Sequence, residues 1–313
     1  LEVLDGQAPA RNDPVRVDTF PGAITRYSGG GTTVQQLLLT EVLGCPFPLV
    51  MDALVFAPLG MMHSTFEQPL PPVRQETAAR PHDGNGRVRE AVMGPEMAAG
   101  GLWTTPGDLM RWAIAIDQAR QGTPGAILSR EMAAQMLTRQ SQGYGLGPEL
   151  EGEGRAFRFA HGGSNVGFRA QLTYFPETGQ GAAIMVNGDG GDPLIDEIQR
   201  TLAAEYGWPA LAPVRVAPVP LDSAAAAALA GEYAMRVDGA AEPIPSRLAY
   251  EGGRWMHTTP IVGGPDELVA VSPTELVSVG WGYSIRFHLD AAGRATGFTL
   301  TYNRNVIPAT RVP

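Results

Sequence analysis

Two short glycine-rich segments of this chain each contain a side chain that could transfer a proton. The first is Tyr27-Ser28-Gly29-Gly30-Gly31 and the second is His161-Gly162-Gly163-Ser164. A phenol with a pKa of about 10 is a poor base at neutral pH, so Tyr27 needs a nearby positive charge that stabilises its phenolate. Glycines in a strand let a substrate backbone approach closely. These residue types permit acid–base chemistry, but Tyr27 taken alone is equally typical of a loop tyrosine packed at a helix start.

The composition excludes one common source of that positive charge. The chain has 23 arginines, and its total of lysine and arginine is also 23, so it contains no lysine. A mechanism that needs a lysine base or a Schiff base cannot run on these residues alone. Neither Ser28 nor Ser164 heads a recognisable nucleophile helix. Cys45, the only cysteine, follows a glycine at a helix boundary and is expected to be a small packed residue.

No cofactor and no metal site is predicted. The five histidines show no ligand spacing, and no cysteine cluster accompanies them. Asp189-Gly190-Gly191-Asp192 lacks the alternating ligands and the closing glutamate of a calcium-binding loop, so we expect it to cap the following helix. His82, between Pro81 and Asp83, is expected in a solvated loop.

The charge and hydropathy patterns bound the partners. The net charge is −9, and phosphate binding needs a basic face, so no nucleic-acid partner is expected. No apolar run approaches the ~20 residues of a membrane span. The chain opens with Leu1-Glu2-Val3, without a starting methionine or a basic leader, so we expect it to begin in the middle of a protein. The compartment is left open between periplasmic, secreted and cytoplasmic, and the oligomeric state is also left open.

The elements that must position these residues begin with helices. Residues 1–26 are expected to be a loop. A helix then follows, capped by Thr32 or Thr33 and ended by Gly44. A second helix is expected from Phe47 to Ala57, where Pro58 stops it. Thr105-Pro106-Gly107-Asp108 has the residue types of a helix N-terminus and predicts a third helix.

A β region comes next, and the residue pattern changes after it. Phe168 to Phe175 alternates, a turn follows, and Gly181 to Val186 returns as a strand before a helix around residues 194–202. Helices on both sides of an antiparallel meander predict an α+β domain. After a proline-rich stretch, a short alanine-rich helix at 222–230 precedes glycine-broken strands that predict a small closed barrel. One of these strands is expected to bury Tyr283, Ile285, Phe287 and Leu289 on one face and to expose His288 on the other.

Four motifs occur in one order along the chain. They are Tyr27 to Gly31, Pro58-Leu59-Gly60-Met61, Gly100-Gly101-Leu102-Trp103-Thr104-Thr105 and His161-Gly162-Gly163. In this order they resemble the class C β-lactamase, D-aminopeptidase and carboxylesterase branch of the penicillin-recognising serine hydrolases. The resemblance implies an α+β domain over residues 1–206, a β-lactamase-like antiparallel sheet packed with helices and incomplete at its N-terminus. It also implies a linker over 207–220 and an all-β, lipocalin-like barrel over 221–313.

The resemblance also implies a site. That family takes its nucleophile and a base from a Ser-x-x-Lys segment, which this chain lacks. The family's proton-shuttling tyrosine corresponds to Tyr27, and its edge-strand triad corresponds to His161-Gly162-Gly163. The backbone amide of Ser164 would then be one oxyanion donor, and the amide of the missing serine would be the other. The implied catalytic residues are Tyr27 and His161, and the implied substrate or oxyanion contacts are Gly29, Gly162, Gly163 and Ser164.

Two departures from the family pattern bear on the substrate. Gly29 stands where the family has an asparagine, and His161 removes a permanent cation where other members have lysine. Both changes favour small esters over β-lactams or peptides. We therefore expect a small-molecule ester or amide substrate, turned over through an acyl-enzyme in a full-length parent, while this chain alone is inactive. Two alternatives stay open: a partial gene product that never acts alone, and a non-catalytic pseudoenzyme that binds a ligand or a partner.

Overall fold

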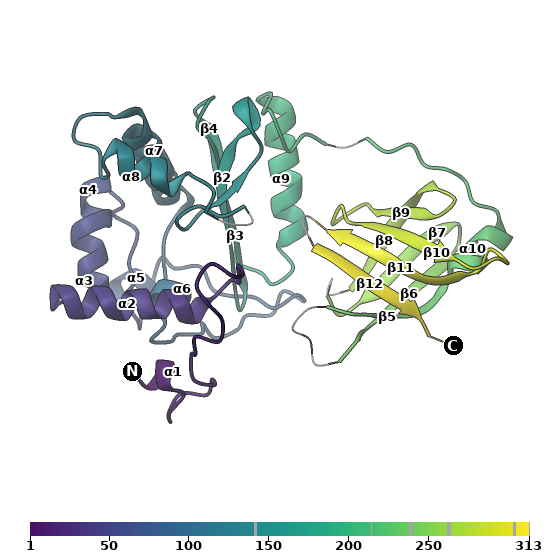
Figure 1. Cartoon of the computed structure of the whole chain (residues 1–313), viewed down its shortest axis with the longest axis horizontal. Coiled ribbons are helices and arrows are strands. Elements are labelled where there is room, and N and C mark those ends of the chain that lie inside the picture. Colours follow the sequence, from purple (N-terminus) through teal and green to yellow (C-terminus); the bar gives the residue numbers. More distant parts are fainter. Residues whose placement is uncertain are drawn as a thin grey trace. The chain divides into compact units, whose positions relative to one another are not determined.

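The computed structural model describes residues 1–140, 143–213, 215–237, 240, 242–261, 264–302 and 305–312. The chain divides into two units, residues 1–212 and 213–313. Figure 1 shows that the first unit (unit 1) combines helices with an open sheet, whereas the second (unit 2) is a barrel. The predicted combination of an α+β fold and an all-β barrel is therefore confirmed.

Unit 1 contains the three helices that the sequence predicted before Gly44, from Phe47 and from Thr105. The helices are α1 (Glu2–Asp5), α2 (Gly29–Leu43), α3 (Phe47–Met51), η1 (Asp52–Phe56), α4 (Ala57–Leu59), α5 (Pro72–Gln75), α6 (Met97–Gly100), α7 (Pro106–Gln121), α8 (Arg130–Met136), η2 (Gly154–Ala156) and α9 (Asp192–Glu205). Helix α7 begins as predicted, because the Thr105 hydroxyl accepts a hydrogen bond from the Asp108 amide at 3.2 Å. Its first residue is Pro106.

Helix α2 starts earlier than predicted. Its N-cap is Ser28, whose hydroxyl accepts from the Gly31 amide at 2.9 Å, so Thr32 and Thr33 are not the cap. Both threonine hydroxyls instead donate to carbonyls one turn back. A serine cap satisfies an amide that the first turn leaves without a partner, and this tolerates glycines in the following turn. Gly44 ends the helix in the left-handed conformation, as predicted.

The prediction that Pro58 stops the second helix was wrong. The helical run continues through α3, a π-helical turn (η1) and α4 to Leu59, and Gly60 ends it with a φ of 64°. Proline has no amide to donate, so it normally disrupts a helix interior. Here the wider turn precedes Pro58 and shifts the hydrogen-bonding pattern, as the bond from the Ala57 amide to the Asp52 carbonyl shows.

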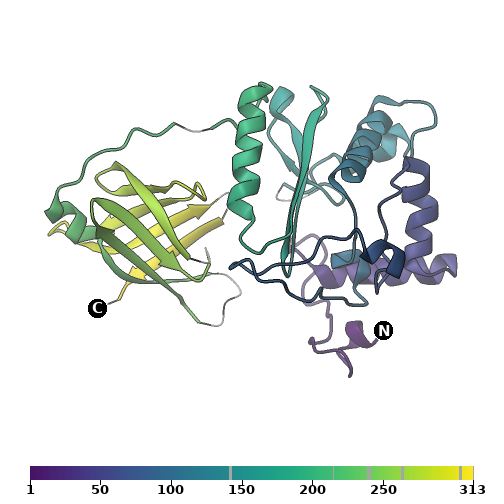
Figure 2. The ribbon, with the colours of Figure 1, turned by 180° about the vertical axis from the view of Figure 1, so that it is seen from behind.

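The sheet of unit 1 is antiparallel and lies between two helical layers. Its strands are β1 (Glu149–Glu151), β2 (Arg158–Asn165), β3 (Phe168–Phe175) and β4 (Gln180–Val186), in that order. Figures 1 and 2 show α7 and α8 on one face and α9 on the other. Because side chains alternate along a strand, Leu172 and Tyr174 pack with Ile116 of α7. Phe175 packs with Ala203 of α9 on the opposite face.

Unit 2 is a closed barrel of eight antiparallel strands. They are β5 (Gly231–Met235), β6 (Ile244–Glu251), β7 (Arg254–Thr259), β8 (Gly264–Ser272), β9 (Glu275–Ser278), β10 (Ser284–Leu289), β11 (Ala295–Tyr302) and β12 (Asn305–Arg311). Each strand pairs with its neighbour in sequence, and β12 pairs with β5 to close the ring. Helix α10 (Ser223–Leu229) precedes the barrel, and its residue Leu229 joins the core.

One predicted inward position of β10 was wrong. Tyr283, Ile285 and Phe287 are buried as expected, but Leu289 is 41% exposed. The pairing of β10 with β11 shifts between His288 and Leu289, and a bulge of this kind reverses which residues face inward. His288 is exposed, as predicted, and its Nε2 lies 2.8 Å from the Thr299 hydroxyl.

The segment between the sheet and the barrel makes contacts at both ends. Trp208 is buried, and its ring lies 5.2 Å from the ring of Phe175 in unit 1. Within unit 2, the Val219 amide donates to the Ala270 carbonyl at 2.7 Å. Residues 207–212 thus belong structurally to unit 1, and at least Val219 is tied to the barrel.

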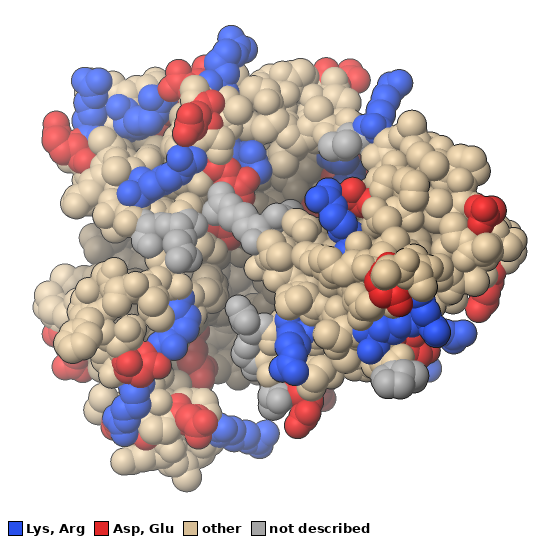
Figure 3. All heavy atoms as spheres, turned by 45° about the vertical axis from the view of Figure 1, so that its right-hand side comes forward, with Lys and Arg blue, Asp and Glu red and all other residues tan. Residues whose placement is uncertain are grey.

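Two surface properties bear on partners. Across the described residues, no single helix is long and apolar enough to span a membrane. Helix α2 and the run Phe47–Leu59, which meet at a bend of 83°, are together long and apolar enough for a span by length and composition only. On the face of the molecule seen in Figure 3, basic and acidic side chains are interspersed between large uncharged areas.

Candidate active site

Tyr27 lies immediately before the N-cap of α2, and its side chain is 73% exposed. The Ser28 cap fixes the backbone that follows it. Gln36, two turns into α2, fastens the helix to the neighbouring loop, because its side chain donates to the Pro95 carbonyl at 2.9 Å and accepts from the Ala98 amide at 2.8 Å. Tyr27 is therefore an exposed phenol on an anchored helix start.

His161 lies on the part of β2 that has a free edge. Strand β1 pairs only with residues 158–160, whereas β3 pairs along the other side of β2 from Phe159 to Asn165. Every residue from His161 to Asn165 is exposed. The Nδ1 atom of His161 lies 2.6 Å from the Gly162 carbonyl. A carbonyl only accepts, so Nδ1 carries the proton, and Nε2 is the acceptor in the neutral ring.

The fold brings these two predicted residues together, although they lie 134 positions apart in the sequence. The centroids of the Tyr27 and His161 rings are 6.4 Å apart, and the ring planes are inclined by 39°. Both side chains are exposed, so solvent and a substrate can reach them. This is a pair of proton-carrying groups at the free edge of a strand.

Each of the predicted glycines could carry a Cβ with ordinary or slightly close contacts. A methyl group added to Gly163 would meet the Ala170 side chain at 3.4 Å, and one added to Gly29 would meet Ala99 at 3.7 Å. At Gly162 the nearest atom is the Gln171 amide oxygen at 3.3 Å, which is the far end of a flexible side chain. The surrounding protein therefore does not require glycine at these positions. Ser164 is also exposed in this stretch.

Sequence reasoning missed the residue that holds the end of β2. The Asn165 side chain donates to the Gly100 carbonyl at 2.8 Å and so joins β2 to α6. The next residue, Gly101, is required sterically, because a Cβ there would lie 2.7 Å from the Cα of Met97. The only signal in the sequence was that an asparagine directly follows Ser164. The motif from Gly100 to Thr105 thus helps to hold the end of β2 in place.

Other candidates have structural partners. His82 was predicted in a solvated loop, but its Nδ1 hydrogen-bonds with the Asn187 carbonyl at 2.9 Å, and the ring is partly buried. Asp189 accepts from the Gly167 amide at 2.7 Å and pairs with Arg169. Asp192 is the first residue of α9 and also pairs with Arg169. Among the residues that the structure describes, no group of three or more histidine, cysteine, aspartate or glutamate side chains is placed to hold a metal ion.

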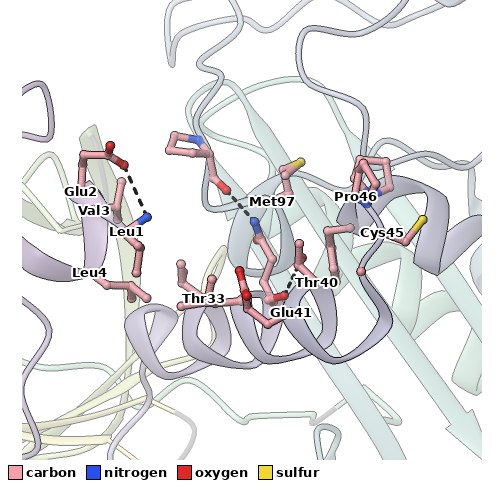
Figure 4. Close-up of a pocket in the computed structure, with 16 residues that line it drawn as sticks. Leu1, Glu2, Val3, Leu4, Thr33, Thr40, Glu41, Cys45, Pro46 and Met97 are labelled. Atoms are coloured by element: carbon pink, nitrogen blue, oxygen red, sulfur yellow. Dashed lines mark hydrogen bonds and ion pairs between the residues drawn. The ribbon is translucent and has the colours of Figure 1, made fainter.

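A cavity of about 590 Å³ lies along α2, away from these residues. Figure 4 shows Thr33, Thr40 and Glu41 of α2 lining it, with Leu1 to Leu4 at one end and Cys45 and Pro46 at the other. The lining includes neither Tyr27 nor any residue of β2. This cavity lacks both the tyrosine and the edge strand in its lining. We therefore assign the candidate site to the Tyr27–His161 surface.

Comparisons with known proteins agree with this architecture. The crystal structure of SurE superposes on this chain with a TM-score of 0.52 and 20% sequence identity. The match covers 97% of this chain and 71% of SurE. The octameric penicillin-binding protein homologue from Pyrococcus abyssi, also 20% identical, gives a TM-score of 0.52 over 93% of this chain and 66% of that one.

At these identities the two structures show a shared fold. A comparison with curated protein sequences found no match. Residues 5–206, which hold Tyr27, His161 and the whole four-stranded sheet, match the family model described as Beta-lactamase. This chain belongs to the β-lactamase family.

Proposed function

We propose that this chain is the larger part of a serine hydrolase that cleaves small esters or amides through an acyl-enzyme. The nucleophilic serine and its lysine would come from a Ser-x-x-Lys segment outside residues 1–313, which contain no lysine. The observation that carries the proposal is the approach of Tyr27 to His161, at 6.4 Å between ring centroids, beside the free edge of β2.

Each residue has a role in this proposal. Tyr27 relays a proton from the attacking serine hydroxyl to the leaving group, once the absent lysine stabilises its phenolate. The Nε2 atom of His161 accepts a hydrogen bond from Tyr27 or from the substrate. The Ser164 amide donates to the carbonyl oxygen that becomes negative in the tetrahedral intermediate, which is worth roughly 10²–10³ in rate for one such donor. Gly29, Gly162 and Gly163 leave room for the substrate chain.

The surface of α2 supports the need for a further segment. Val34, Leu38 and Val42 recur every four residues, so they share one helix face, and they are 47%, 60% and 71% exposed. The opposite face carries Thr33, Gln36 and Thr40 and is buried or partly buried. A helix that points its apolar side outward lacks a packing partner. We propose that the serine- and lysine-bearing segment packs there.

The substrate preference follows from two side chains. Glycine at position 29 offers no side-chain amide that could hold a substrate amide, and histidine at 161 offers no permanent cation that could hold a carboxylate. We propose that small esters are turned over faster than β-lactams. We also propose that unit 2, whose strands follow one another around a closed ring, is a lipocalin-like appendage without a catalytic group.

The test compares this chain with a version extended by the upstream reading frame. Each protein is incubated with a fluorophosphonate and analysed by intact mass. We expect no covalent adduct on residues 1–313 alone, and one adduct per molecule of the extended protein that disappears when its Ser-x-x-Lys serine is changed to alanine. A stoichiometric adduct on the chain alone would show that an internal serine is the nucleophile. An upstream frame without Ser-x-x-Lys would favour the pseudoenzyme instead.

The same extended protein tests the substrate preference. We expect kcat/KM for a short-chain nitrophenyl ester to exceed that for a chromogenic cephalosporin. A clear advantage for the cephalosporin would contradict the roles given to Gly29 and His161.

A further inference from the structure

The interior of the barrel contains a chain of hydrogen-bonded polar side chains. His257 on β7 is fully buried, its Nε2 lies 2.8 Å from the Ser246 hydroxyl on β6, and its Nδ1 lies 2.6 Å from the Tyr283 hydroxyl before β10. Ser246 and Tyr283 are 1% and 2% exposed. A histidine is the one residue type whose ordinary pKa lies near neutrality, so its burial between two hydroxyls calls for an explanation.

Asp266 continues this chain. It lies on β8 directly opposite His257 in the strand register, and it is 8% exposed. Its Oδ2 atom has no hydrogen-bond partner, and neither has the hydroxyl of Thr259, two residues beyond His257 on the same inward face. Within the described part of the chain, no arginine forms an ion pair with Asp266. The polar end of the barrel therefore contains a carboxyl group without a basic partner.

Two other uses of this cluster conflict with its burial. Ser246 with His257 resembles an activated serine, but a substrate cannot reach a hydroxyl that is 1% exposed. A bound ion or small molecule would need space beside Asp266 and Thr259, yet solvent does not reach their unpartnered atoms. A proton is the one species that can enter without displacing a neighbour.

We propose that Ser246, His257, Tyr283 and Asp266 form an acid-responsive device whose protonation at His257 loosens the polar end of the barrel. A neutral imidazole accepts at one ring nitrogen and donates at the other, whereas an imidazolium donates at both. Proton uptake therefore forces both hydroxyls to act as acceptors toward His257. Ser246 must then redirect its own hydrogen inside a closed core, where an unsatisfied donor is costly.

The groups that face His257 act in opposite directions. Burial lowers the pKa of His257 to about 4, and the nearby Asp266 raises it without overcoming burial. Burial, with Asp266 adding to it, holds the pKa of the Tyr283 phenol well above its usual value, so this hydroxyl stays protonated. Phe298 of β11 contacts the ring and carries no charge. The charged residues next in sequence to Ser246 and Asp266 are Arg247 and Glu267, and they pair with Glu232 and Arg254.

The pH window follows from the two states of His257. In the unfolded chain its pKa is about 6.5, so between pH 6.5 and 4 the opened barrel binds a proton that the closed barrel does not. Stability contributed by the neutral ring is complete above that range and is lost as the pH falls through it. The opened fraction should rise roughly 50-fold from pH 7 to pH 4.5.

Hydrogen exchange measured by mass spectrometry on the whole chain tests this proposal. After correction for the intrinsic exchange rate, protection of β6, β7 and β8 should fall by that factor between pH 7 and pH 4.5. His257→Gln should remove most of this dependence, and the matched control His288→Gln, an exposed histidine on β10, should retain it. Equal protection at both pH values, or an unchanged dependence in His257→Gln, would overturn the proposal.

A second measurement covers the case in which His257→Gln fails to fold. Imidazole NMR signals of the wild-type chain report the titration directly. We expect His257 to stay neutral at pH 5.5 and Tyr283→Phe to shift the His257 titration. A His257 signal that titrates near 6.5 would overturn the proposal whatever the variant does.

Discussion

The approach of Tyr27 to His161 depends on short-range anchors on each side. The Ser28 cap and Gln36 hold the start of α2, while Asn165 holds the end of β2 against α6. The residue pair itself was predicted because four motifs in one order resemble a known family, whereas a tyrosine or a histidine beside glycines would not single out a site alone. Gln36 and Asn165 were not, because a single polar residue carries no local signal of a partner 62 or 65 positions away.

Removing the Tyr27 hydroxyl should have a large kinetic effect and a small structural one. In the extended enzyme, Tyr27→Phe should lower kcat on the order of 10²–10⁴, the usual worth of a positioned acid–base group. The Tyr27 side chain is 73% exposed, so the free energy of unfolding should be nearly unchanged. Tyr206→Phe, at a tyrosine that is 62% exposed, is the matched control and should retain full activity. A loss of less than about tenfold would remove Tyr27 from the proton relay.

At the scale of elements, local chemistry predicted some boundaries well and others poorly. The Thr105 cap, the Gly44 end and the extent of β3 all follow from neighbouring residues. Pro58 and Leu289 did not behave as predicted, because a π-helical turn and a bulge shift the backbone pattern. Both features depend on tertiary packing that a local pattern does not report.

The outward apolar face of α2 gives an element-scale prediction. In residues 1–313 alone, Leu38→Gln should change the free energy of unfolding by no more than about 0.5 kcal/mol, because an exposed leucine loses little burial. Leu172→Ala, at a position 6% exposed, should cost about 2–5 kcal/mol. In the extended protein, Leu38→Gln should cost at least about 1 kcal/mol, because the face is then covered. Equal effects in both proteins, measured by urea unfolding, would show that the segment packs elsewhere.

At the scale of the whole molecule, the chain separates into a sheet unit that holds every candidate site residue and a barrel that holds none. Residues 1–212 include Tyr27, His161 and Ser164. The hydrophobic clusters of unit 1 share no residue with the core of the barrel. The barrel's own polar cluster is closed to solvent. On these grounds we propose that unit 1 contains all the catalytic groups of this chain and that unit 2 contains none.

Cutting the extended enzyme after Ala212 tests that division. This position keeps Trp208 on its partner Phe175, so the sheet unit retains its packing, and it removes the barrel together with the segment that Val219 ties to it. If the barrel is only an appendage, kcat/KM for a small ester should stay within about fivefold of the intact enzyme, a change worth no more than about 1 kcal/mol of transition-state stabilisation. Circular dichroism should show the helix content of unit 1 unchanged.

A collapse of kcat/KM in a protein that is still folded would mean that the barrel supplies part of the substrate site. A rise in KM with an unchanged kcat would assign the barrel to substrate binding, because binding that is equal in the ground and transition states affects KM alone.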